Sequence, residues 1–232
     1  MVYIQDANNL EPKYNELLKL VEKELACSAH NIEHVMRVYN LCLLLSKGEK
    51  GIDFDVLKSA AILHDIARVK EDSDKSGRID HAILGAQMAR KILAENGYPE
   101  EKIEKIAHCI ESHRLRGTIR PKTIEAKILY DADKVDVLGA VGIARCFALG
   151  GKYGQKLYSD VDLREYIKEN TIQKSGRIKD ISKHAPNLEY ELKLKHIPKM
   201  LYTKKAKKLA KKRMQIMKEF FRQMKKEVEG KI

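Results

Sequence analysis

A histidine and an aspartate, His64 and Asp65, stand side by side in the otherwise apolar stretch SAAILHDIA. An adjacent imidazole and carboxylate can offer one nitrogen and one oxygen to the same cation. A buried carboxylate is costly unless it is paired, hydrogen-bonded or bound to a metal, so an apolar helix has little other reason to carry one here. His34 in NIEHVMRV and Asp133 in ILYDADKVDVLGA lie in similar apolar surroundings. The four residues together predict a site for a divalent metal ion.

The spacing of apolar residues places these candidates on the inner faces of helices. Val38 and Leu45 follow His34 at offsets of 4 and 11, and Ala61 precedes His64 by three residues. Asp133 lies one turn after Leu129. Such spacing is typical of a helix face turned to the core. Three separate helices are therefore expected to converge on one interior site, as they do in helical metal proteins.

The chain as a whole reads as one soluble globular domain. It has 232 residues, of which 44% are hydrophobic and 34% charged, so it can bury a substantial core. The start MVYIQDANNLEPKY has an early acid and no apolar run, which predicts no secretory signal, and no stretch is long enough to span a membrane. Four scattered cysteines indicate reduced thiols in a cytoplasmic protein.

The pattern predicts an all-α fold, because no long strand-like alternation is present. We expect Asp53 to cap the third predicted helix. Two charged or glycine-rich segments, 68–80 and 150–186, are expected to be irregular, and each could either border a site or be a solvated connection. The predicted helices span 11–26, 31–47, 53–68, 80–96, 99–113, 121–137 and 138–149.

The positive charge is concentrated at the C-terminal end of the chain. Residues 199–232 contain 13 Lys/Arg and 3 Asp/Glu, or +10 of the total +12. Apolar residues recur there every three to five positions, which predicts a basic amphipathic helix. One interpretation is a docked helix with a solvated lysine face, and the other is that the lysines attract the phosphates of nucleotides or nucleic acid. The apolar stripe could equally serve a homodimer.

The order His34, His64-Asp65, Asp133 resembles the HD-domain superfamily of metal-dependent phosphohydrolases. The segments AHNIEHVMRV, AAILHDIA, AHCIESHR and EAKILYDADKVDVLGAVGIAR, with the basic helix, resemble one HD subgroup over nearly the whole length. The resemblance implies a single HD-type domain over 1–232, a helical bundle with a central metal site, a core at about 11–150 and a helical extension over 151–232. It also implies that these four residues hold a divalent metal.

Two imidazoles and two carboxylates favour Mn, Fe, Co or Ni and could accept Mg, and the absence of thiolates argues against structural zinc. Two remaining positions on the metal would hold water and a phosphate oxygen. A metal ion lowers the pKa of bound water and neutralises charge on a phosphoryl group.

Further histidines follow the dyad. His108 and His113 are expected to line the pocket, where an imidazole could contact phosphate or protonate a leaving oxygen. Related HD phosphodiesterases use such histidines for a second metal, but five residues correspond to about 140° around a helix, so these two cannot easily face one ion. The alternatives are a second metal and polar residues satisfied by hydrogen bonds. His81 could equally be a first-turn residue that faces water.

Other charged residues near these motifs are candidates for substrate binding and for proton transfer. Arg37 lies three residues after His34, close enough to bind a phosphate. Glu71 or Asp72 could act as general base toward the attacking water, as acids from this region do in HD nucleotidases, or both could be loop charges. Lys134 next to the metal aspartate could face substrate, and Arg145 is either a phosphate contact or an ion-pair partner.

The sequence therefore predicts a metal-dependent phosphohydrolase in which metal-activated water attacks a phosphate ester or anhydride. The expected substrate is a small phosphate compound, and the resemblance favours nucleotides. Nucleoside triphosphate pyrophosphohydrolysis is considered first, then 5′-nucleotidase activity and then hydrolysis of cyclic nucleotides. The alternative from another class is a non-catalytic module that binds nucleotide or nucleic acid.

Overall fold

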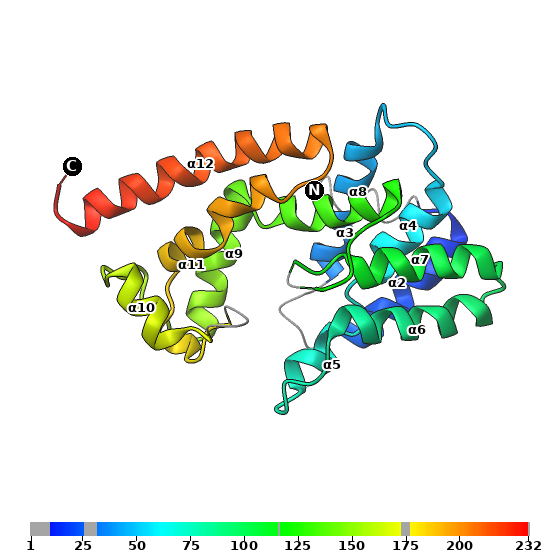
Figure 1. Ribbon diagram of the computed structural model, residues 1–232, viewed down its shortest axis with the longest axis horizontal. Coiled ribbons are helices and arrows are strands. Elements are labelled where there is room, and N and C mark those ends of the chain that lie inside the picture. The colour runs from blue at the N-terminus through cyan, green and yellow to red at the C-terminus, as the bar shows by residue number, and fades with distance from the viewer. Residues whose placement is uncertain (1–9, 26–31, 116, 173–176, 232) are drawn as a thin grey trace. The chain divides into compact units, whose positions relative to one another are not determined.

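The computed structural model describes residues 10–25, 32–115, 117–172 and 177–231, and it is built from helices (Figure 1). Among these residues Thr171 and Ile178 form one isolated antiparallel bridge, and no sheet is present. The predicted all-α fold is confirmed. In chain order the helices are α2 (Pro12–Leu25), α3 (Ile32–Ser46), α4 (Phe54–Leu63), α5 (Arg68–Ser73), α6 (His81–Glu95), α7 (Glu100–Ser112), α8 (Ile124–Asp136), α9 (Gly139–Lys152), α10 (Leu163–Asn170), η1 (Ile181–Lys183), α11 (Pro186–Leu192), η2 (Leu194–Lys199) and α12 (Lys204–Val228).

The chain divides into two compact units, residues 1–133 and 134–232. The boundary falls within α8, whereas the sequence suggested a core that extends to about residue 150. The first unit contains α2 to α7 and most of α8, and the second contains α9 to α12. A single HD-type domain over the whole chain stays a prediction. None of the described helices combines the length and the apolar character that crossing a membrane requires.

Helix α4 is the centre of the first unit. It packs against α2, α3 and α7, while α6 and α7 lie side by side (Figure 1). Ala60, Ala61, Ile62 and Leu63 are fully buried. The apolar last turn of α4 must be enclosed by other elements, and this explains why α4 packs against three helices.

The N-terminal end of α4 is fixed by two aspartates. Asp53 caps the helix, as predicted, by accepting hydrogen bonds from the backbone amides of Asp55 and Val56. The Asp55 carboxylate accepts from Lys13 Nζ (2.7 Å) and Tyr14 Oη (3.0 Å) of α2 and from Lys102 Nζ (2.7 Å) of α7. Partial burial opposes ionisation, but these hydrogen bonds outweigh it and lower the pKa of Asp55 to about 2.

The C-terminal end of α4 differs from the prediction. The expected helix 53–68 ends at Leu63, and residues 64–67 form turns. Here the backbone bonds run from Ile66 N to Leu63 O (3.1 Å) and from Arg68 N to Asp65 O (2.8 Å), which is the tighter spacing of three residues. The predicted continuous helix was wrong because this tightening reorients the chain directly at the dyad.

The other predicted helices are confirmed, with their described ends shifted by at most three residues. The predicted ends at residues 26 and 31 lie outside the described residues. The prediction of irregular structure for the two segments was partly wrong, because both contain helices. Segment 68–80 begins with α5, and segment 150–186 contains α10 and η1.

The second unit is organised around the contact between α9 and α12. Helix α12 buries Ala206, Ala210, Met217 and Phe221 on one face, which confirms a basic amphipathic helix at the C-terminal end. The Phe221 ring stacks on Tyr190 with 4.8 Å between centroids. Near the start of α9, Gly142 allows the helix to approach the connection that precedes it, since a Cβ at this position would lie 2.1 Å from the carbonyl oxygen of Val137.

Two glycines of α9 offer a matched test of this packing. Gly142→Ala is expected to lower the free energy of unfolding by about 1–3 kcal/mol, because the new methyl group overlaps the backbone of Val137. Gly151→Ala, with nothing within 4 Å of the new atom, is expected to raise it by up to about 1 kcal/mol. Urea unfolding of both variants checks this, and equal effects would contradict the close approach.

Candidate metal centre

Four side chains of the first unit converge as the sequence predicted. His34 projects from α3, His64 lies at the C-terminal end of α4, and Asp65 is in the turn that follows. His34 Nε2 lies 3.4 Å from His64 Nε2, 3.6 Å from Asp65 Oδ2 and 3.4 Å from Asp133 Oδ1. Atoms bound to one ion at about 2.1 Å stand about 3 Å apart in adjacent positions. His34, His64 and Asp65 are therefore close enough to share an ion after a small contraction, and Asp133 approaches this group from the side of His34.

A second group shares Asp65. His81 Nε2 and His113 Nε2 lie 3.5 and 3.6 Å from Asp65 Oδ1, and 3.2 Å from each other. The two carboxylate oxygens thus serve different groups, because Oδ2 faces His34 and His64 (3.8 Å) while Oδ1 faces His81 and His113. Asp65, His81 and His113 are all buried and form a second set of donors that could hold a metal.

His81 corrects one sequence expectation. Its position in the first turn of α6 left open a side chain that faces water, but its side chain is buried. His108 and His113 were both expected to line the pocket, and the structure separates them. His113 joins the imidazole cluster, whereas His108 is half-buried and its Nε2 accepts a hydrogen bond from the backbone amide of Lys122 at 3.0 Å.

Three of the imidazoles are oriented by acceptors on their outer nitrogen. His64 Nδ1 lies 2.8 Å from the Ala61 carbonyl oxygen, His113 Nδ1 lies 2.6 Å from that of Ile110, and His81 Nδ1 lies 2.6 Å from Glu71 Oε2. Because these oxygens can only accept, Nδ1 donates and the lone pair of Nε2 points into the cluster.

This orientation creates electrostatic repulsion that a cation would remove. The Nε2 atoms of His81 and His113 face each other at 3.2 Å, and both have a donor proton on Nδ1. For two neutral rings, this sets lone pair against lone pair in a buried place. The donor set therefore fits a divalent ion better than it fits a purely structural network.

The protonation states also suit ligation. Burial lowers the pKa of His64 to about 4 and also lowers the pKa of His81. Burial by itself would raise the pKa of Asp65, but the surrounding imidazoles outweigh it and hold this pKa well below its usual value. At neutral pH His64 and His81 are therefore neutral and Asp65 is ionised, which are the forms that bind metals.

The predicted general bases occupy different surroundings. Glu71 is held by His81, by Arg68 Nη1 (3.0 Å to Oε2) and by Arg114 Nη2 (2.7 Å to Oε1). Asp72 is exposed and pairs with Arg68 Nη2 at 3.0 Å. Glu71 thus orients a histidine of the cluster, and a role for either acid as general base stays a prediction.

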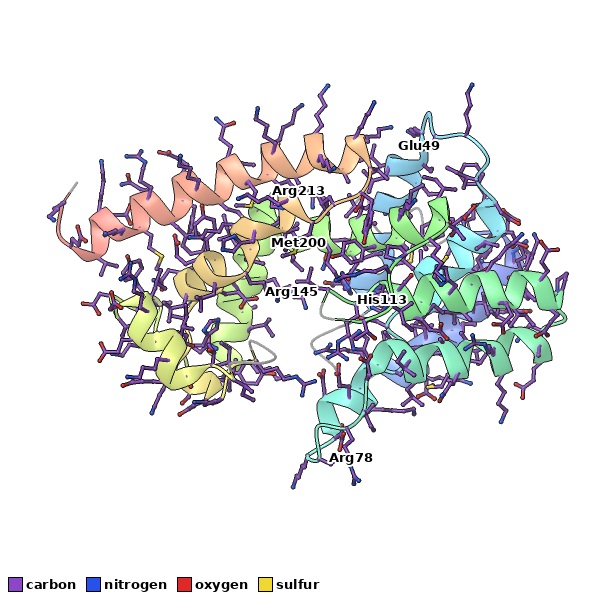
Figure 2. All side chains as sticks on the ribbon, in the orientation of Figure 1. Glu49, Arg78, His113, Arg145, Met200 and Arg213 are labelled. Atoms are coloured by element: carbon purple, nitrogen blue, oxygen red, sulfur yellow. The ribbon has the colours of Figure 1, made fainter. Side chains whose placement is uncertain are left out.

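The predicted substrate-binding residues fall in both units. Arg37 is half-buried on α3, one turn after His34. Lys134 is buried on α8, and Arg145, labelled in Figure 2, lines a cavity of about 170 Å³ in the second unit together with His184 and Lys193. Their contacts with substrate stay predictions.

The sequence analysis missed the support given by Arg68 and Arg114. Arg114 bridges Glu71 and Asp80 at 2.7 Å each, and Asp80 caps α6 just before His81. The sequence signal for this support was the helix cap, since an aspartate immediately before a histidine indicates that a helix begins at that histidine. The pairing of Glu71 with His81 depends on the path of residues 74–80, which periodicity does not encode.

Comparison with known proteins agrees with this geometry. The family model for the HD domain matches residues 31–138, a range that contains every member of both donor groups. The Bacillus subtilis protein YpgQ is 31% identical over 207 residues, which cover 88% of this chain and 86% of YpgQ. The chain belongs to the HD-domain family.

Solved structures of HD-domain proteins share the fold over nearly the whole chain. Bacillus subtilis YpgQ in complex with ADP has a TM-score of 0.68 and 25% identity, and the match covers 93% of this chain and 94% of that one. An HD-superfamily hydrolase from Bacillus thuringiensis has a TM-score of 0.67 and 27% identity, and the match covers 94% of this chain and 97% of that one.

A partial sequence match is to ribonuclease Y of Symbiobacterium thermophilum. It is 26% identical over 128 residues, which are 55% of this chain and 22% of that enzyme.

The buried histidines predict acid lability of the metal-free protein. The ordinary pKa of histidine is near 6.5, so below this pH the unfolded chain binds a proton that folded His64, with a pKa of about 4, does not. Stability should therefore fall as pH decreases from 6.5 toward 4, with a loss of about 2 kcal/mol from His64 at pH 5.

Urea unfolding in EDTA between pH 7.5 and 5 checks this. His64→Gln should flatten the dependence on pH, whatever its effect on absolute stability. His108→Gln should flatten it less, because His108 is only half-buried. A wild-type protein whose stability does not change over this range would contradict the buried neutral state.

Proposed function

We propose that this HD-domain protein is a metal-dependent phosphohydrolase that acts on nucleotides. The observation that carries the proposal is the division of Asp65 between two histidine groups, which sets donors for one or two divalent ions around a single buried carboxylate. Membership of a family that contains HD-superfamily hydrolases supports hydrolysis as the reaction. The complex of YpgQ with ADP supports a nucleotide as the ligand.

The residues around the cluster fit this chemistry. His34, His64, Asp65 and Asp133 would hold one divalent ion, with Mn, Fe, Co, Ni and Mg all compatible with the donors. Such an ion supplies Lewis acidity and a water of lowered pKa. Arg37 would bind a phosphate oxygen beside His34, and Glu71 keeps His81 directed at Asp65. Lys134, Arg145 and His108 remain candidates for substrate contacts, with His113 as a proton donor if no second ion binds.

Nucleoside triphosphate pyrophosphohydrolysis and 5′-nucleotidase activity are the first two reactions that we propose. A second candidate is hydrolysis of a phosphodiester, as in cyclic nucleotides. The group formed by Asp65, His81 and His113 favours it, since two ions can stabilise both the attacking and the leaving oxygen. The partial match to ribonuclease Y also points toward phosphodiesters.

We also propose that the protein works in the cytoplasm. Cys42 and Cys109 are buried free thiols and Cys146 is half-buried, which suits a reducing compartment. A homodimer through the apolar residues left exposed on α12, Ile216 and Val228 among them, stays a prediction.

The number of ions is tested by titration of metal-free protein with Mn²⁺. Wild type is expected to bind two ions, and His81→Asn and His113→Asn one each. Asp65→Asn should weaken both sites, because its carboxylate is shared. Glu71→Gln should weaken one site about 10- to 100-fold, as loss of the partner of a metal-bound histidine does.

His108→Asn is the control and should bind as wild type does, because His108 lies outside both groups. Isothermal titration or elemental analysis gives the stoichiometry. A wild-type protein with a single ion that His81→Asn leaves unchanged would assign His81 and His113 to substrate instead.

The reaction is tested by product release from nucleoside mono-, di- and triphosphates, cyclic nucleotides and short RNA, each with Mn, Co, Ni or Mg. Hydrolysis that needs metal and falls at least about 100-fold in Asp65→Asn would support the proposal. Pyrophosphate, phosphate or an opened cyclic ester as product would choose among the reactions. A metal-loaded protein that binds nucleotides and never turns them over would instead make it a binding module.

A further inference from the structure

A row of unpaired cations covers one face of α12. We call it the lysine face, and it consists of Lys204, Lys207, Lys208, Lys211, Lys212 and Lys218, all exposed. Among the described residues, none of these six side chains forms an ion pair. From residue 200 to residue 218 the chain has eight Lys/Arg and no Asp/Glu. At 1.5 Å per residue, the lysine face extends over about 21 Å along the helix.

The arrangement of charge works against the helix itself. Lysines of like charge stand three or four residues apart, as Lys204 and Lys208 do, and such pairs destabilise an isolated helix. The first turn of α12 contains no acid and is rich in lysine, although the N-terminal end of a helix favours negative charge. Solubility alone would be served as well by mixed charges. The distribution is thus suited to a dense negative charge from outside the chain.

The rest of α12 is already committed to packing. Ala206, Ala210, Met217 and Phe221 face the second unit, and Arg213 Nη1 donates to the Val135 carbonyl oxygen at 2.7 Å. The packing therefore leaves the lysine face exposed on the outer side of α12.

The chemistry of the face favours a nucleic acid over a membrane. Helices that bind in a bilayer surface need large apolar side chains beside their lysines. Here the exposed large apolar residues of α12 are Ile216, Phe220 and Val228, and none lies between Lys204 and Gln215. A single nucleotide is too short to span the row, whereas the backbone of a nucleic acid presents regularly spaced phosphates along its length.

We propose that the lysine face of α12 binds the phosphate backbone of a nucleic acid without reading its sequence. Sequence-independent binding follows because the face has no exposed aromatic side chain on which bases could stack. The proposal is independent of the proposed reaction, so Asp65→Asn should bind nucleic acid as well as wild type does.

Fluorescence anisotropy of the full chain with a labelled 30-nucleotide RNA and a 30-base-pair DNA, from 50 to 200 mM KCl, tests this. The variant Lys204→Gln/Lys207→Gln/Lys208→Gln/Lys211→Gln should bind about tenfold or more weakly, and the slope of log K against log[KCl] should become shallower by about 3–4. The same four positions changed to Arg should retain binding, because the charge is kept.

The matched control removes the same charge from exposed lysines of the first unit, in Lys19→Gln/Lys23→Gln/Lys50→Gln/Lys91→Gln. It should change affinity less than threefold. Equal weakening in both variants would overturn the proposal, since only net charge would then matter. Failure of the wild-type protein to bind either nucleic acid at 50 mM KCl would also overturn the proposal. Binding of polyglutamate or phosphatidylserine vesicles as tightly as RNA would overturn it as well. Equal helix content by circular dichroism ensures that the variants are compared as folded proteins.

Discussion

The ionised carboxylate of Asp65, enclosed by the imidazoles of His34, His64, His81 and His113, is the interaction on which the first unit depends. Its environment is buried and the ring lone pairs of His64, His81 and His113 point into the cluster, so a bound cation would compensate its charge. The four histidines surround this carboxylate, since each has its Nε2 within 4 Å of an Asp65 oxygen. The turns at residues 64–67 place the Asp65 side chain among the four imidazoles, at the point where α4 ends and α5 follows.

Both donor groups use the same carboxylate, that of Asp65, but the two groups differ in their surroundings. If each group holds an ion, the first ion would withdraw electron density from the shared carboxylate and add positive charge close to the second group. Binding at the two groups would then be coupled, and the first ion should bind more tightly than the second. The outer hydrogen bonds differ as well, because His64 and His113 donate to backbone carbonyls whereas His81 donates to the carboxylate of Glu71. A carboxylate partner makes an imidazole a stronger donor.

Sequence reasoning reached the parts of the centre that periodicity and ligand chemistry determine. The inward faces of the helices and the donor types of His34, His64, Asp65 and Asp133 can both be read from local pattern. The helical fold and most helix ends follow from the same signals. The role of His81 was left open between a second-metal histidine and a residue that faces water, because its partner Glu71 is reached across a loop, and loops have no period. The break after Leu63 was missed because SAAILHDIA remains apolar through the turns, so the hydrophobic pattern does not change where the backbone does.

The anchoring of α4 at Asp55 has a mechanical consequence for the dyad at the other end. Eight helical residues separate Asp55 from His64, a length of about 14 Å. Lys13, Tyr14 and Lys102 grip that carboxylate from two neighbouring helices and so set how far α4 can slide along its axis. Because α4 is stiff, any axial displacement at the grip is transmitted undiminished to His64 and Asp65. The length of α4 therefore sets the distance between Asp55 and the dyad, and a shift at the Asp55 end would displace the ligands from one another.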